Sequence, residues 1–163
     1  MSKNNIEKPS FSFSFSKILE LKLLQYIEKN KKQEIMGGLI GDIIGKKQNQ
    51  IVFEVKEFLP FPNLAENKQY YAKPPEIWFN ILEAWRSFYF VRYKFIGFLH
   101  THPEGSSKMS NEDNEFAQFL QEKYGTILFV IIGENKNFRS YVFNKEGFKI
   151  INGKLQKYRI MSK

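Results

Sequence analysis

The spacing of apolar residues along the chain predicts short strands interspersed with three helices. Phenylalanine and serine alternate over residues 11–15, which predicts a strand with a phenylalanine face. Longer apolar or alternating runs predict further strands at 35–44, 51–59, 95–100, 126–132, 138–143 and 148–151. Apolar residues three and four apart predict helices at 17–31, 74–92 and 110–124. This order of elements predicts the α/β class, with a mixed β-sheet flanked by helices.

The predicted helices carry apolar faces that we expect to pack into the core. The first helix follows Ser16, a suitable N-cap, and ends in a basic run at Lys29 to Lys32. In the third helix, Phe116, Phe119 and Leu120 are expected to face inward. The second helix has the longest stripe of residues at helical spacing, and we interpret this stripe as core packing. Its members are Trp78, Ile81, Leu82, Trp85, Phe88, Tyr89 and Arg92.

The chain divides into one domain and two terminal segments. Residues 1–10 are polar and are expected to be disordered, and residues 11–152 form the predicted domain. Thr126 to Ile132 is a continuous apolar run, so we place it inside the sheet. Asn152-Gly153 is a hairpin signal, and residues 153–163 are expected to form an edge strand or a loose tail.

Composition narrows the class of protein. The 163 residues are 42% hydrophobic and 17% aromatic, enough for one folded domain with a core. There is no cysteine, which excludes disulfides and thiolate metal sites. No secretory signal is visible, and the longest apolar run, 127–132, is too short to span a bilayer. We therefore expect a soluble, cytoplasmic protein without membrane partners.

The net charge of +8 makes nucleic acid a candidate partner, because its phosphates are negatively charged. The lysines are scattered rather than clustered, however, and the chain is rich in Lys, Asn, Ile and Phe together. Such a mixture is typical of solvated lysines in a compositionally biased protein. Specific nucleic-acid binding is the less favoured interpretation.

Both histidines of the chain lie at the end of one predicted strand. His100 and His102 are two residues apart, so they share a face of that strand. Asp113 follows after a short loop containing glycine and serine. Two imidazoles and one carboxylate supply three protein ligands, and a fourth zinc position then stays open to water. This ligand set is typical of a catalytic rather than a structural zinc site.

Each half of this motif also has a structural interpretation. Ser110-x-x-Asp113 ahead of an apolar periodic run is a helix-capping arrangement. Paired histidines at a strand end can be ordinary surface residues. The use of every histidine of the chain in one constellation favours the metal interpretation.

The combined pattern resembles the JAMM signature of the JAB1/MPN/Mov34 metalloprotease family. His100-x-His102-Pro103, then Ser110 and Asp113, stand in the order and spacing of that signature. Upstream, residues 34–41 fit the family's Glu-x-x-Gly-x-Leu-x-Gly form, beginning at Glu34. Pro62-Asn63-Leu64-Ala65 is similar to a stretch of prokaryotic members. The resemblance covers roughly residues 15–145.

This resemblance implies the MPN fold, of the cytidine-deaminase-like type, in a compact prokaryotic form. It implies one Zn²⁺ per chain, held by His100, His102 and Asp113. It further implies that Glu34 is the general base and then acid, and that Ser110 donates a hydrogen bond to the oxyanion. The implied substrate is an amide bond after the C-terminal glycine of a ubiquitin-like or sulfur-carrier protein, which would be the partner.

Three alternatives remain open at this stage. The chain could be a non-catalytic MPN scaffold, a RadC-like DNA-associated protein, or a hydrolase of a small-molecule amide.

The loop at 60–73 includes Tyr70 and Tyr71, which either line a groove or pack locally. The oligomeric state is open, although an exposed edge strand could mediate a dimer.

Overall fold

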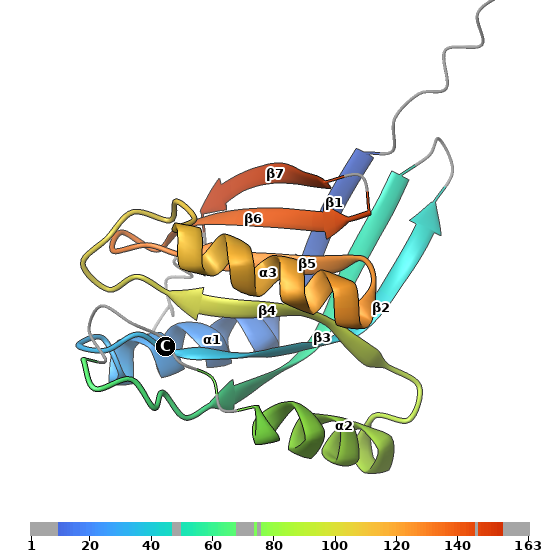
Figure 1. Cartoon of the computed structure of the whole chain (residues 1–163), viewed down its shortest axis with the longest axis horizontal. Helices are drawn as coiled ribbons and strands as arrows, with labels where there is room; N and C mark the ends of the chain where they lie inside the picture. Colours follow the sequence, from blue (N-terminus) through green and yellow to red (C-terminus); the bar gives the residue numbers. More distant parts are fainter. Residues whose placement is uncertain (1–9, 47–49, 68–73, 75, 146, 155–163) are drawn as a thin grey trace, which may run out of the picture.

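A computed structural model describes residues 10–46, 50–67, 74, 76–145 and 147–154. Within these ranges the chain forms three helices and a sheet of seven strands (Figure 1). The strands are β1 (Ser10–Phe15), β2 (Met36–Lys46), β3 (Gln50–Phe61), β4 (Lys94–Thr101), β5 (Ile127–Ile132), β6 (Asn137–Asn144) and β7 (Gly147–Lys154). The helices are α1 (Lys17–Lys29), α2 (Ile77–Tyr89) and α3 (Asn111–Tyr124). No described helix combines the length and apolar character that crossing a bilayer requires.

The sheet is mixed, as the sequence predicts. Its strand order is β1-β3-β2-β4-β5-β6-β7. The β1–β3 and β4–β5 pairs are parallel, and the four other neighbouring pairs are antiparallel. Strand β5 lies in the interior of the sheet and is buried along its whole length, which confirms the prediction made from its continuous apolar run.

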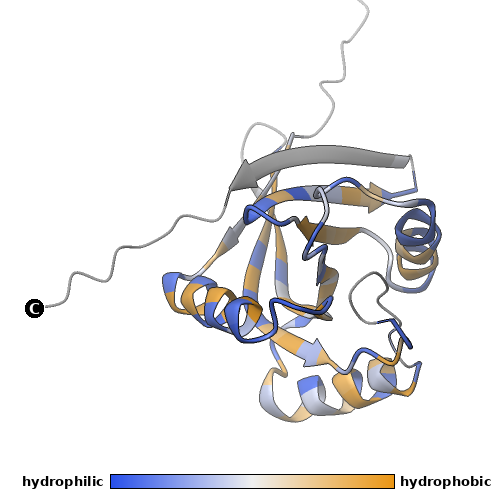
Figure 2. Cartoon of the chain, turned by 90° about the vertical axis from the view of Figure 1, so that its left-hand side faces the viewer, coloured by the Kyte–Doolittle hydropathy of each residue, from blue (hydrophilic) through white to orange (hydrophobic). Residues whose placement is uncertain are grey.

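Helices cover both faces of the sheet and create two hydrophobic clusters. Figure 2 shows α1 on one side of the sheet and α3 on the opposite side. The first cluster joins α2 and α3 to the sheet and contains Phe79, Phe98 and Phe129. The second joins α1 to the other face and contains Leu19, Leu23 and Leu99, with the phenylalanines of β1 packed against it.

The predicted start of α1 agrees with the structure, and the predicted end does not. Ser16 caps α1, because its hydroxyl oxygen accepts the backbone N–H of Leu19 at 3.1 Å. The helix ends at Lys29 rather than at residue 31. The reason is Asn30, whose side chain donates to the carbonyl of Tyr26 at 2.8 Å in place of a further helical turn.

The predicted core stripe of α2 is wrong in part. Leu82 is buried, but Ile81, Phe88 and Tyr89 are exposed by 42%, 82% and 74%. The helix also occupies 77–89 rather than 74–92, since Phe90 leaves the helix and packs on Trp85. Apolar spacing alone does not reveal that this helix covers the edge of the core with only one side.

Two smaller expectations are also wrong. Phe119 of α3 is 49% exposed and stacks on Phe116 rather than entering the core. Asn152 and Gly153 form no turn; they lie within β7, opposite Arg139 and Phe138. The sequence also predicts a turn at Asn144 to Gly147, and this prediction is confirmed: the two residues pair at the end of the β6–β7 hairpin, and Gly147 has a φ of 115°. The predictions for residues 1–9, for Tyr70 and Tyr71, and for the tail after Lys154 lie outside the described residues.

Gly97 lets β4 approach β5, and its replacement by alanine tests this packing. An added Cβ would overlap the carbonyl oxygen of Leu128 in β5. We expect Gly97→Ala to lower the free energy of unfolding by about 2–4 kcal/mol, measured by urea denaturation. The control is Gly45→Ala, where nothing lies within 4 Å of the added atom, and its expected change is below about 0.5 kcal/mol. Equal stability of the two variants would contradict this account.

Candidate metal centre

The end of β4 places both histidines beside the start of β2. Met36 lies opposite His100 in the antiparallel β2–β4 pair. The pairing continues past the end of β2, because the backbone N–H of Thr101 donates to the carbonyl of Ile35 at 3.0 Å. His100 therefore shares the face of Met36, whose side chain belongs to the cluster beneath α2 and α3. His102, two residues on, points to the same side.

Asp113 reaches the histidines from the first turn of α3. A capping box fixes this turn: Ser110 Oγ accepts the Asp113 backbone N–H at 3.0 Å, and Asp113 Oδ2 accepts the Ser110 N–H at 2.8 Å. The structural interpretation of the Ser-x-x-Asp spacing is thus confirmed. The capping box is compatible with the contact to the histidines, because Asp113 Oδ1, which the cap does not use, lies next to His100.

The three candidate ligands converge. His100 Nε2 lies 3.0 Å from Asp113 Oδ1, and His102 Nε2 lies 3.5 Å from Oδ2. The two Nε2 atoms are 3.0 Å apart. One ligand atom from each of the three residues lies within 4.8 Å of the others. These residues could therefore hold a metal ion.

The donor set and its spacing fit zinc. Tetrahedral zinc with bonds of about 2.0–2.1 Å separates its ligand atoms by about 3.3 Å, close to the three separations above. His102 Nδ1 lies 2.8 Å from the carbonyl oxygen of Ser106, so a proton on Nδ1 leaves the Nε2 lone pair free for a metal. His100 Nδ1 is buried without a hydrogen-bond partner among the described residues, and the ring contacts Phe98 and Phe129 instead.

The three side chains also bias one another's protonation. Burial alone would raise the pKa of Asp113, but hydrogen bonds from His100 and His102 outweigh it and hold that pKa well below its ordinary range. Burial alone would lower the pKa of His102, whereas the hydrogen bonds to Asp113 and to the Ser106 carbonyl raise it above its usual value. The carboxylate of Asp113 is consequently ionised throughout the neutral range, as a metal ligand must be.

Glu34 lies next to this group without joining it. Extending the β2–β4 register two residues past the Met36–His100 pair places Glu34 opposite His102. The side chain is 6% exposed, and burial raises the pKa of Glu34 to about 7, with attraction to His102 and repulsion from Asp113 as smaller influences. A carboxyl group that titrates near neutrality beside a candidate metal site is suited to accept and return a proton.

Two hydrogen bonds hold the backbone at Glu34. Asn63, which is buried, donates from its side chain to the Glu34 carbonyl at 3.1 Å. Thr101 Oγ1 accepts the N–H of Ile35 at 3.1 Å. Sequence reasoning did not find these supporting roles. Asn63 drew attention only as part of a resemblance, and nothing in the sequence distinguishes Thr101 from an ordinary strand residue.

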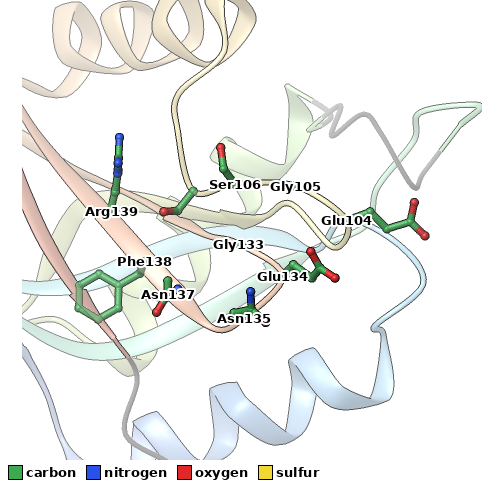
Figure 3. A pocket seen from close by; sticks show the side chains of 10 residues that line it. Glu104, Gly105, Ser106, Gly133, Glu134, Asn135, Asn137, Phe138 and Arg139 are labelled. Carbon is green, nitrogen blue, oxygen red and sulfur yellow. The ribbon is translucent and has the colours of Figure 1, made fainter.

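A polar cavity of about 510 Å³ adjoins the loop that follows His102 (Figure 3). Its walls come from that loop, from the segment that joins β5 to β6, and from the first residues of β6. The lining residues are Glu104, Gly105, Ser106, Ser107, Gly133, Glu134, Asn135, Asn137, Phe138 and Arg139. None of the three candidate ligands lines it. Two of its lining residues contact the site at His102: the Gly105 N–H donates to the His102 carbonyl at 3.2 Å, and the Ser106 carbonyl lies 2.8 Å from His102 Nδ1.

The structure brings three of the candidate site residues together and places the other two, Glu34 and Ser110, on the adjoining segments. His100, His102 and Asp113 form one group, and Glu34 faces it across the strand pair. Ser110 stands at the start of α3 and is exposed. Its hydroxyl oxygen serves the helix cap, while the hydroxyl proton remains available for donation.

Comparison with known proteins identifies the family of this chain and a solved structure with a similar fold. The family model described as JAB1/Mov34/MPN/PAD-1 ubiquitin protease matches residues 12–124. The chain is also similar to the solution structure of a protein from Desulfitobacterium hafniense, at 17% sequence identity and a TM-score of 0.59. That alignment covers 88% of this chain and 90% of the other, and it supports the fold alone. No curated protein matches the sequence.

The raised pKa of Glu34 predicts a specific pH dependence for the metal-free protein. The folded state holds this proton up to about pH 7, above the ordinary value of 4.5, so the stability it contributes is present at low pH and is lost as pH rises through 7. Glu34→Gln removes the buried charge. We therefore expect the variant to gain stability over wild type in EDTA at about pH 8.5 but little at about pH 5.

Thermal unfolding at the two pH values measures this difference. The matched control is Glu115→Gln on the exposed surface of α3, which should show no such change with pH. A Glu34→Gln effect that is the same at both pH values would contradict the assignment of a buried, neutral carboxyl group.

Proposed function

Because the chain belongs to the JAB1/Mov34/MPN/PAD-1 family, we propose that it is a zinc-dependent peptidase. The proposed reaction is hydrolysis of the amide bond after the C-terminal glycine of a ubiquitin-like protein. One observation carries the proposal: His100, His102 and Asp113 converge on a single point, with the buried carboxyl group of Glu34 beside them.

In this proposal His100 and His102 bind the metal through Nε2 and Asp113 binds it through a carboxylate oxygen. The group is held by rigid elements, since the histidines end a buried strand and Asp113 is fixed by its capping box. Zinc bound by these residues would polarise the substrate carbonyl and lower the pKa of a coordinated water. Three protein ligands leave a position for that water.

Glu34 moves the proton. The water oxygen forms the new bond to the carbonyl carbon, and a Glu34 carboxylate oxygen accepts the proton that the water loses. The C–N bond then breaks, and Glu34 returns this proton to the departing amine. Burial favours the protonated form of Glu34, so the side chain can hold the accepted proton until the amine departs.

Ser110 assists at the carbonyl oxygen. Its hydroxyl proton is not used by the helix cap, which needs only a lone pair of the oxygen. A hydrogen bond from this hydroxyl to the developing negative charge supports the reaction. The N-terminus of α3 adds positive potential at the same place.

The family description names a ubiquitin protease, which favours a ubiquitin-like substrate. Between Asp113 and β5 this chain has only the rest of α3 and two residues, so the described part of this region holds no inserted segment. Sulfur-carrier proteins, which the resemblance also implies as substrates, are included in the proposal.

Replacement of Glu34 separates catalysis from metal binding. We expect Glu34→Gln to retain about one zinc per chain, because Glu34 is not among the three converging ligands. Its cleavage of a fluorogenic Gly-Gly amide of a ubiquitin-like protein should fall by about 10²–10⁴-fold. Asp113→Ala should lose both zinc and cleavage. Elemental analysis and initial rates measure the two effects.

The matched control is Glu112→Gln, an exposed carboxylate in the same turn of α3, which should retain both properties. Unchanged cleavage by Glu34→Gln would contradict its role. Wild-type protein without bound zinc would favour the non-catalytic scaffold, and salt-sensitive binding to duplex DNA would favour the RadC-like alternative.

Variants of Ser110 distinguish its two functions. Aspartate caps a helix as well as serine does but offers no proton, so Ser110→Asp should keep stability while its rate falls by about 10²–10³-fold. Ser110→Ala should lose the same rate and also about 1 kcal/mol of stability. Ser110→Thr, which keeps both groups, is the control. A wild-type rate in Ser110→Asp would refute the donation to the oxyanion.

A further inference from the structure

The segment that joins β4 to α3 is held by hydrogen bonds although it has no regular secondary structure. It carries His102 at one end and Ser110 at the other, and we name residues 102–110 the ligand loop. Inside the loop, the Gly105 N–H bonds the His102 carbonyl and the Ser106 carbonyl meets His102 Nδ1. The conformation of the loop therefore decides how the His102 ring is oriented, so whatever holds the loop affects the candidate metal centre.

Tyr141 of β6 contacts the ligand loop at two points. Its hydroxyl accepts the backbone N–H of Met109 at 3.1 Å and donates to the Ser107 carbonyl at 3.4 Å. Tyr141 is 4% exposed, belongs to the first hydrophobic cluster and lies opposite Phe129 in the β5–β6 pair. Because the ring is buried in the core, its hydroxyl has a fixed position from which it holds the loop.

The two contact points adjoin the residues on which the candidate centre depends. Ser107 directly follows Ser106, whose carbonyl meets His102 Nδ1. Met109 directly precedes Ser110, the N-cap of α3. One hydroxyl therefore joins the half of the loop that orients a candidate ligand to the half that begins the helix bearing another.

The early part of the ligand loop packs closely against the turn between β5 and β6. The Glu134 N–H donates to the Gly105 carbonyl at 3.0 Å. A Cβ added to Gly133 would lie 2.8 Å from the Gly105 oxygen and 2.8 Å from the Ser107 nitrogen, closer than such carbons come in proteins. Figure 3 shows Gly105 next to Gly133. The early part of the loop thus lies on the backbone of this turn, while the later part is held by the tyrosine hydroxyl.

We propose that Tyr141 is a positioning residue of the candidate metal centre. It is not one of the three converging ligands, and it acts through the backbone of the ligand loop. Its hydroxyl holds the conformation in which the Ser106 carbonyl accepts a hydrogen bond from His102 Nδ1 and Ser110 begins α3. A proton held on Nδ1 keeps Nε2 as the metal-binding nitrogen. The catalytic consequence rests on the proposed function, whereas the loop contacts do not.

Tyr141→Phe removes the hydroxyl and keeps the ring, so it tests the contact without opening the core. We expect the Met109 amide proton of the metal-free protein to exchange with solvent at least about tenfold faster, because it loses its hydrogen-bond acceptor. NMR measures this exchange relative to that of the Val130 amide in the buried strand β5. The ratio cancels any general loss of stability in the variant.

The matched control is Tyr124→Phe, which removes a hydroxyl from another tyrosine of the same region. The Tyr124 ring packs against the first hydrophobic cluster, and its hydroxyl makes no hydrogen bond within the described part of the chain. The ratio of Met109 to Val130 exchange in this variant should stay within about twofold of the wild-type value. Thermal unfolding verifies that both variants are folded.

The histidine rings give a second measurement that needs neither metal nor substrate. The chain has only two histidines, so their ring signals are readily separated in NMR spectra. We expect the Nδ1 proton of His102 to be visible in the wild type, because the Ser106 carbonyl protects it from exchange. The signal should be lost in Tyr141→Phe and retained in Tyr124→Phe.

Cleavage of the Gly-Gly amide substrate by the zinc-loaded protein measures the catalytic consequence. We expect Tyr141→Phe to lower kcat by about 10–100-fold with KM within about twofold of wild type, because misplaced groups weaken transition-state binding more than substrate binding. Tyr124→Phe should keep both constants. A purely structural role would lower the fraction of folded protein and leave the kcat of the folded fraction unchanged.

An unchanged ratio of Met109 to Val130 exchange in Tyr141→Phe would overturn the proposal. So would a His102 Nδ1 proton that persists in this variant together with a wild-type kcat. A wild-type protein that cleaves no substrate would refute the proposed function alone, because the exchange and ring measurements are made without metal or substrate. The positioning role and the proposed function can therefore fail separately.

Discussion

The register between β2 and β4 is the constraint on which the site depends. Met36 opposite His100, followed by the backbone bond between Ile35 and Thr101, places Glu34 opposite His102. Residues more than sixty positions apart in the chain thereby share one face of the sheet. A shift of one residue would direct Glu34 to the opposite face and separate it from the histidines.

The capping box of α3 serves the fold and the site together. Asp113 stabilises the start of the helix through Oδ2 and meets His100 through Oδ1. The helix therefore holds the candidate ligand at a fixed position before any metal binds. Such preorganisation reduces the ordering that binding would otherwise require. It also explains why the Ser-x-x-Asp spacing has two valid interpretations: both describe the same atoms.

The outer surface of α2 contrasts with this site. The site holds its polar groups in a partly buried corner, with Glu34 and His100 buried, whereas α2 exposes apolar side chains on a protein with a net charge of +8. Helix α2 buries Phe79 and Leu82 in the core, and its exposed apolar side chains do not contribute to that core. The candidate metal centre and the exposed apolar side of α2 are therefore two separate surfaces with distinct chemistry.

Sequence patterns by themselves determined the order of the elements and the candidate ligands, because both are contained in short stretches of the chain. The helix caps at Ser16 and Ser110 could be predicted from the sequence, and the two-residue period of a strand predicted that His100 and His102 lie on one face. Only the tertiary structure decided which apolar faces are covered. The stripe of α2 has the same spacing whether it is buried or exposed, since periodicity reports direction and not the presence of a neighbour. The tertiary structure also decided which polar groups support the site, because Asn63 acts through a contact that only the folded arrangement creates. The pairing of β2 with β4 also brought Glu34 to the histidines, and this pairing could not be predicted locally, since the partner and register of a strand depend on the whole sheet.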